Sequence, residues 1–129
     1  MKAKLFAALL ALSGTGLGVS AQTTVEGEDL IIRLSGDRGW KIECELEKEG
    51  GGALEPRARG RGRSSTGSIV GRNVVGGACA AEAGRGDLRL TIVDEMGHFV
   101  CPFGEPTDDG LCIGRVGEGE TLDWTVERQ

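Results

Sequence analysis

The feature that most constrains the fold of this chain is an alternation of apolar and polar residues at every second position. In the stretch 40–49, apolar side chains occupy one face of an extended chain, and mainly lysine and glutamate occupy the other. This pattern is typical of a half-buried β-strand. No long stretch has the spacing of an amphipathic helix. We therefore predict strands over 29–35, 40–49, 68–75, 78–82, 87–94, 98–103, 112–116 and 122–127.

Turn signals, mostly glycine, separate these short segments. The chain contains 23 glycines; such a content also suits a disordered protein, but the regular alternation argues against disorder. About seven or eight short strands with turns between them indicate an antiparallel β-sandwich, immunoglobulin-like or jelly-roll-like. The predicted fold class is therefore all-β.

The N-terminus has the features of a secretory signal peptide over residues 1–21. Two lysines precede an apolar run over 5–12, and small or medium-sized residues precede a predicted cleavage site after Ala21. The apolar run is too short for a membrane-spanning helix, which needs about 20 residues. We expect residues 22–129 to form one exported domain, secreted or periplasmic. The preference for arginine over lysine, with abundant glycine and alanine, indicates a GC-rich bacterial genome.

Four cysteines follow the predicted cleavage site: Cys44, Cys79, Cys101 and Cys112. An even number of cysteines in a small exported chain predicts two disulfides, for which three connectivities exist. We favour Cys44–Cys79 and Cys101–Cys112, which pair neighbours along the chain. Each would stabilise the domain by about 3–4 kcal/mol on the chain-entropy model.

Two neighbouring stretches carry charges with a period of two: Glu43, Glu45, Glu47 and Glu49 in the first, and Arg57, Arg59, Arg61 and Arg63 in the second. In an antiparallel hairpin with 50–56 as its connection, one register places every glutamate opposite an arginine. We predict this charged hairpin, whose ion pairs would specify the register. Glycines within the arginine run favour the alternative of a mobile loop.

A third interpretation of the arginine run is a nucleic-acid-binding arm. Such arms stack bases on aromatic side chains, whereas no aromatic residue lies among these arginines. The net charge of −5 also argues against a polyanion-binding protein, since such domains are usually basic. We therefore predict no nucleic-acid partner.

No catalytic or metal-binding pattern is convincing. His98 and Cys101 form an H-x-x-C, but the chain has no C-x-x-C, so we predict no metal site and no cofactor. The chain has no G-x-S-x-G nucleophile motif with which His98 could act as the general base. The acidic stretch 105–110 does not match a calcium-binding loop. We predict that the protein is not an enzyme.

The predicted function is that of a small, exported, non-catalytic binding or structural module. Its partner is unknown; an exported protein or a component of the cell envelope would fit. One candidate binding surface is the tip of the hairpin, and another is the acidic loop that contains Thr107, Asp108, Asp109 and Gly110. The alternative is an inhibitor of an exported hydrolase, acting through the loop that a Cys101–Cys112 disulfide would close, because such a loop is pre-organised for insertion.

Overall fold

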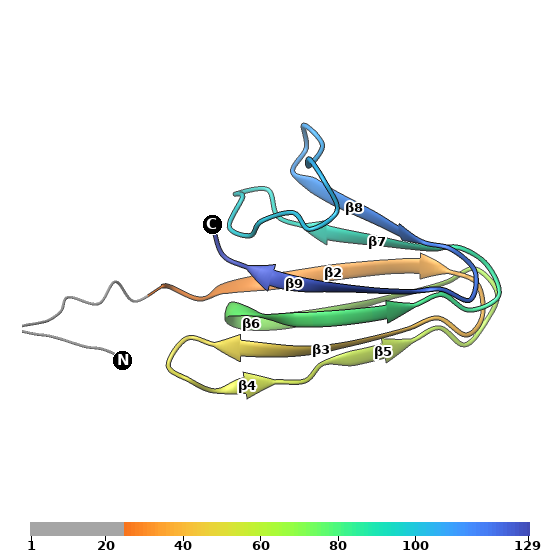
Figure 1. Ribbon diagram of the computed structural model, residues 1–129, viewed down its shortest axis with the longest axis horizontal. Helices are drawn as coiled ribbons and strands as arrows, with labels where there is room; N and C mark the ends of the chain where they lie inside the picture. The colour runs from red at the N-terminus through yellow and green to blue at the C-terminus, as the bar shows by residue number, and fades with distance from the viewer. Residues whose placement is uncertain (1–24) are drawn as a thin grey trace, which may run out of the picture.

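The computed structural model describes residues 25–129, so the predicted signal peptide lies outside the described residues (Figure 1). No helix in this part of the chain is long and apolar enough to cross a membrane. Its strands are all antiparallel, as predicted. They are β2 (Glu28–Gly36), β3 (Lys41–Lys48), β4 (Ala53–Leu54), β5 (Arg57–Arg59), β6 (Ser65–Glu82), β7 (Leu88–Val93), β8 (Leu111–Val116) and β9 (Thr121–Glu127).

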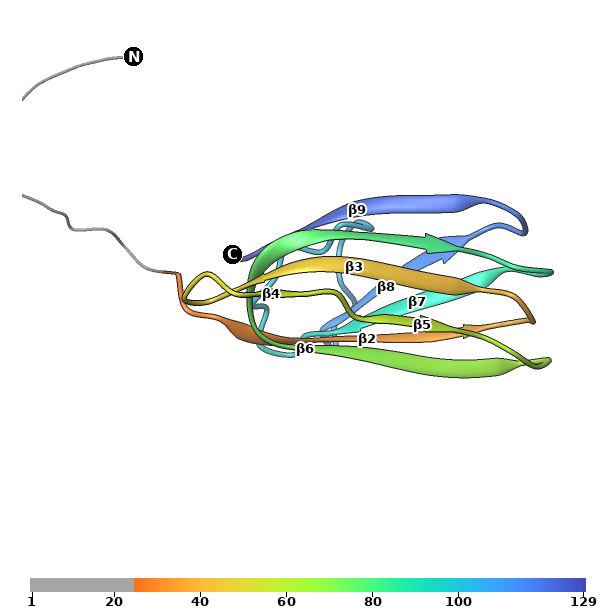
Figure 2. The ribbon, with the colours of Figure 1, turned by 90° about the horizontal axis from the view of Figure 1, so that it is seen from below.

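The long strand β6 belongs to both halves of the structure. Its first part pairs with β2, and its second part lies between β3 and β9. Figure 2 shows β6 curving from one layer of strands into the other. Asn73 and Gly77, with φ angles of 58° and 144°, lie in the stretch where β6 changes partners. We call β2, β7, β8 and the first part of β6 the β2 half, and the remaining strands with the second part of β6 the β3 half.

Hydrogen bonds connect all eight described strands into one sheet, in the order β4-β3-β6-β2-β7-β8, with β5 beside β3 and β9 beside β6. The predicted all-β antiparallel fold with two disulfides is therefore confirmed. The division into two separate sheets, which defines a sandwich, stays a prediction.

A single hydrophobic core is formed by the inward-facing residues of both halves. Each strand contributes every second side chain, because alternate residues of a strand point to opposite faces. Leu30, Ile32 and Leu34 come from β2, and Ile42 and Leu46 from β3. No polar or charged residue of the described chain is buried, so the core contains no ionisable group whose burial would need compensation.

Trp40 is the largest fully buried side chain of the described residues, and its indole occupies the space where side chains at positions 60 and 67 would lie. Its Nε1 donates a hydrogen bond to Ser65 Oγ at 2.8 Å. A Cβ at Gly60 would lie 2.0 Å from Trp40 Nε1, and one at Gly67 would lie 2.8 Å from the Trp40 ring. Distances this short are incompatible with a side chain, so both positions require glycine unless the indole moves.

Cysteine pairing is Cys44–Cys79 and Cys101–Cys112, the connectivity favoured from the sequence. Cys44 and Cys79 are directly opposite each other on β3 and β6, with Cα atoms 4.0 Å apart. The second disulfide ties the connection between β7 and β8 to the second residue of β8. One bridge therefore joins neighbouring strands, and the other holds a loop.

The predicted register of the charged hairpin is wrong. β3 does pair antiparallel with the segment that follows it, but Glu43 is opposite Arg57 and Lys41 is opposite Arg59. The cause is a tighter turn than expected: Gly51 N–H donates to Lys48 O at 3.0 Å, and Lys48 N–H donates to Gly52 O at 2.8 Å. Glu47 is consequently opposite Ala53, six residues before Arg59, the partner that a connection over 50–56 would give it.

None of the expected Glu–Arg ion pairs forms in residues 25–129, where the ion pairs are those of Lys41 with Glu82 and of Arg128 with Glu28. Arg61 and Arg63 lie exposed in the connection between β5 and β6. The shift in register is even-numbered, so the charged side chains still share the outer face. Alternation therefore predicted the face correctly, while the turn determined the partners.

Two strand predictions also need correction. The segment 98–103 is not a strand; it contributes one isolated bridge, between Phe99 and Arg128. The segments 68–75 and 78–82 are parts of the single strand β6. Gly71 lies within β6, where an added Cβ would be 2.8 Å from the Leu46 side chain and 2.9 Å from that of Val74, so this position favours glycine.

Candidate functional site

The connection between β7 and β8, residues 94–110, is the longest loop in the described part of the chain. Loops longer than about 12–15 residues within compact domains are usually functional or disordered. This one is ordered by contacts at both of its ends and in its middle.

Apolar side chains anchor the middle of the loop to the core. Phe99 is buried, and the ring of Phe103 packs edge-on against Trp124 with ring centroids 5.1 Å apart. Phe103 also covers Gly114 of β8, where a Cβ would lie 2.7 Å from the Phe103 ring. Phe99, Cys101 and Phe103 alternate as in the predicted strand, but they belong to a loop whose three side chains pack against the core.

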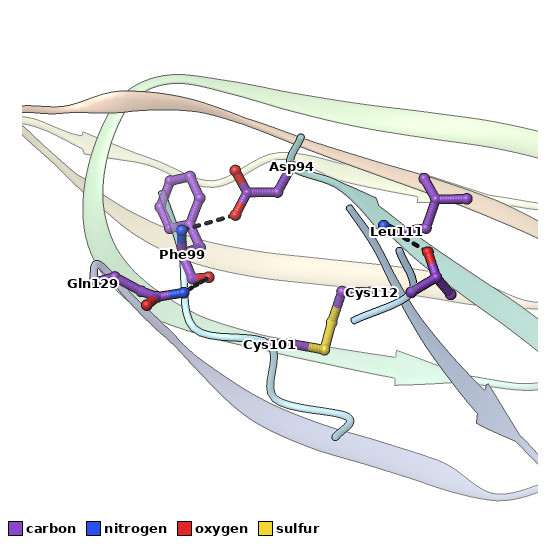
Figure 3. The surroundings of a disulfide bond; sticks show 7 residues. Asp94, Phe99, Cys101, Leu111, Cys112 and Gln129 are labelled. Atoms are coloured by element: carbon purple, nitrogen blue, oxygen red, sulfur yellow. Dashed lines mark hydrogen bonds between the residues drawn. A yellow bond between two sulfur atoms is a disulfide. The ribbon is translucent and has the colours of Figure 1, made fainter. Parts of the chain in front are cut away.

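Polar contacts order the start of the loop. The two carboxylate oxygens of Asp94 accept hydrogen bonds from the backbone N–H groups of His98, at 2.9 Å, and Phe99, at 2.8 Å. Figure 3 shows the Asp94 carboxylate directed at the Phe99 nitrogen, with the Cys101–Cys112 disulfide nearby. The C-terminus adds a further contact, because Gln129 Nε2 donates to Phe99 O at 3.1 Å.

His98 contributes to this anchoring. Its Nδ1 lies 3.3 Å from Glu28 Oε1, and Arg128 Nη2 lies 3.9 Å from Glu28 Oε2. Arg128 also donates to the backbone oxygen of His98 and lies over the ring of Phe99, 5.7 Å from its centroid. The histidine thus links the loop, the first residue of β2 and the C-terminal segment.

The predicted binding loop forms a compact turn at the end of the connection. Thr107 Oγ1 accepts a hydrogen bond from Leu111 N–H at 3.1 Å, and Thr107 N–H donates to Leu111 O at 2.9 Å. Gly110 N–H donates to Thr107 O at 3.0 Å, and Gly110 adopts a φ of 78°. Asp108 and Asp109 lie exposed between these residues. The turn has a defined backbone, and its two carboxylates face solvent.

A second candidate site is a groove of about 470 Å³ on the outer face of the β3 half. Ala78 and Ala80 of β6 lie along it, between residues of β3 and β9. Carboxylates dominate its polar lining, with one arginine among them: Glu43, Glu45, Glu55, Asp123 and Arg57. We call the four carboxylates and the two alanines the acidic groove.

Three residues of the predicted charged hairpin, Glu43, Glu45 and Arg57, therefore meet in this groove, although not as ion pairs. Asp123, Ala78 and Ala80 are not among the site residues predicted from the sequence. Alternation along 122–127 does predict that Asp123 faces outward, but the pairing of β9 with β6 joins residues that are 39 to 51 positions apart in the chain, from Glu82 with Thr121 to Gly76 with Glu127. That pairing was not visible in the local pattern.

Within residues 25–129, no group of three or more histidine, cysteine, aspartate or glutamate side chains is arranged to hold a metal ion. Comparisons with protein-family models, curated proteins and solved structures found no match for this chain.

Proposed function

We propose that this protein is an exported, non-catalytic binding module that recognises its partner through the β7–β8 loop. The observation that carries the proposal is the order of residues 94–110. A disulfide, the Asp94 carboxylate and the Thr107 turn hold the backbone, while Met96, Asp108 and Asp109 stay exposed. A loop that is ordered before binding loses less conformational entropy when it binds.

Export is the cellular setting that this proposal requires. The two disulfides are consistent with an oxidising, extracellular environment. The predicted signal peptide would deliver the chain there. A pre-organised, disulfide-held loop on a β-scaffold is a common arrangement for recognition, because loops positioned by rigid strands tend to carry function.

The experiment is a capture assay with the immobilised protein and the envelope and medium fractions of its source. We expect Asp108→Ser/Asp109→Ser to reduce the captured partner at least about tenfold, as for substitutions at a binding hot spot. Glu118→Ser is the matched control, because it removes an exposed carboxylate from another turn. Equal capture by the wild type and the loop variant, with unchanged circular dichroism, would overturn the proposal.

A second candidate function, inhibition of an exported hydrolase, is favoured by Met96. This side chain is 78% exposed at the start of the same loop, and a flexible thioether fits many apolar pockets. The capture assay separates the two functions if hydrolase activity in the fractions is titrated with the protein. Loss of inhibition in Met96→Ser would support the inhibitor. A hydrolytic activity of the protein itself that His98→Ala abolishes would overturn both binding-only functions.

A further inference from the structure

The outer face of the β2 half carries three arginines on three neighbouring strands. Arg33 of β2, Arg89 of β7 and Arg115 of β8 are all exposed. Arg89 is directly opposite Arg115, and Arg33 is diagonal to Arg89, since Arg33 pairs with Thr91. We call these three arginines the arginine face.

No carboxylate neutralises the arginine face. The ion pairs of residues 25–129 are formed by Lys41 and Arg128, and His98 Nδ1 lies 3.3 Å from Glu28 Oε1. Asp87, two residues before Arg89, is the closest acidic residue along the chain and forms none of these ion pairs. Like charges directly opposite each other destabilise a strand pair. The stability of the monomer therefore gives no reason for this arrangement.

The acidic groove carries an excess of the opposite charge. Four carboxylates, those of Glu43, Glu45, Glu55 and Asp123, line it beside a single arginine, Arg57 opposite Glu43, and none of these five side chains forms an ion pair within residues 25–129. Glu43 and Asp123 are aligned on either side of Ala80, so about 9–10 Å separates their strands. The small alanine side chains leave the space between these carboxylates open. A long arginine side chain fits such a space, with its stem over the alanines and its guanidinium between carboxylates.

The two surfaces lie on opposite sides of the shared hydrophobic core, because each is on the outer face of its half; Figure 2 shows the two layers of strands. One molecule cannot bring its own arginines to its own groove. We infer that the arginine face of one copy of this chain docks on the acidic groove of another copy. Since the two surfaces differ, the contact is head to tail, and it leaves a free groove and a free arginine face at the ends of every assembly.

The charge composition agrees with this partner. A net charge of −5 makes approach to an external polyanion unfavourable over most of the surface. A second copy presents its carboxylates in one groove, where three arginines can meet them. Electrostatic complementarity of this kind chiefly sets the orientation and the association rate, and salt screens it. The contact does not use the β7–β8 loop and is independent of the function proposed for it.

Sedimentation velocity on the oxidised protein tests the inference. We expect the wild type to associate with rising concentration at low salt and to return to monomer at about 0.5 M NaCl, where screening is strong. Neutralising the arginine face by Arg33→Gln/Arg89→Gln/Arg115→Gln should weaken association at least about tenfold. The groove variant Glu43→Gln/Glu45→Gln/Asp123→Asn should do the same.

Mixing the two variants gives the decisive measurement. Each retains one intact surface, so an equimolar mixture should form a 1:1 complex, with a dissociation constant close to that of the wild-type contact, and nothing larger. Two controls should associate like the wild type: Arg61→Gln/Arg63→Gln, which removes arginines outside both surfaces, and the loop variant Asp108→Ser/Asp109→Ser.

Two results would overturn the inference. One is a wild-type protein that stays monomeric up to about millimolar concentration, a dissociation constant that corresponds to about 4 kcal/mol. The other is a variant mixture that stays monomeric under conditions in which the wild type associates. Binding of heparin by a monomeric wild type, abolished in the arginine variant, would instead assign the arginine face to an acidic glycan.

Discussion

The β3 half and the β2 half bury similar apolar side chains on their inner faces but distribute charge differently on their outer faces. In the β3 half, Lys41 Nζ lies 3.4 Å from Glu82 Oε1, and Arg57 is directly opposite Glu43 in the strand pair. In the β2 half, Arg89 stands opposite Arg115. The core requires only that inward residues be apolar, whereas the outer positions are free to carry charges that serve something other than folding. This difference between the two outer faces is the basis of the contact that we infer between copies of the chain.

The two disulfides also differ between the halves, and their removal should have the largest effect. Cys44–Cys79 closes a separation of 35 residues, and Cys101–Cys112 closes one of 11. On the chain-entropy model, Cys44→Ala/Cys79→Ala should cost about 4 kcal/mol and Cys101→Ala/Cys112→Ala about 3 kcal/mol. Urea denaturation measures both. A greater loss for the loop disulfide would show that residues 94–110 stabilise the core more than the β3–β6 bridge does.

The packing of the β3 half can be tested with two neighbouring glycines. Gly60→Ala should destabilise the protein by about 1–3 kcal/mol, because its Cβ would meet the buried Trp40 indole. Gly62→Ala is the matched control: nothing lies within 4 Å of its Cβ, so its effect should stay within about 0.5 kcal/mol. Thermal denaturation of both variants checks the register, since equal effects would be incompatible with Gly60 lying under Trp40.

The smallest expected effect compares the two outer faces directly. Arg89→Glu creates an opposite-charge pair with Arg115 and should stabilise the monomer by about 0.2–1 kcal/mol. Arg57→Glu is the same substitution opposite Glu43, and it should destabilise the protein by a similar amount. Denaturation at low and high salt measures both, and salt should reduce each effect. Two shifts of the same sign would refute the contrast between the faces.

Much of the fold could be predicted because alternation reports which side of a strand is buried. Trp40, Ile42 and Leu46 point inward as expected, and the charged residues between them point outward. What the local pattern could not specify was how strands combine. The register of β3 depends on a turn whose glycines adopt φ angles of 89° and 97°, and a conformation of this kind shortens the connection without changing the alternation.

The candidate sites were predictable only in part for the same reason. Thr107 to Gly110 are consecutive, so a turn over them could be expected from the sequence. Arg33, Arg89 and Arg115 each occupy an outward position of a predicted strand, but only the pairing of β2 with β7, and of β7 with β8, makes them neighbours. Asp123 reaches the groove through the pairing of β9 with β6. Long-range pairing thus created both outer surfaces.

The sharing of β6 between the halves has a kinetic consequence. Its partners β2 and β3 precede it in the chain and β9 follows it, so most of its pairings close long loops before they gain contacts. Proteins dominated by such non-local pairings fold in milliseconds to seconds. We expect neither half to stay folded alone, because β6 contributes its first part to the β2 half and its second part to the β3 half. Folding and unfolding should therefore follow a single cooperative transition.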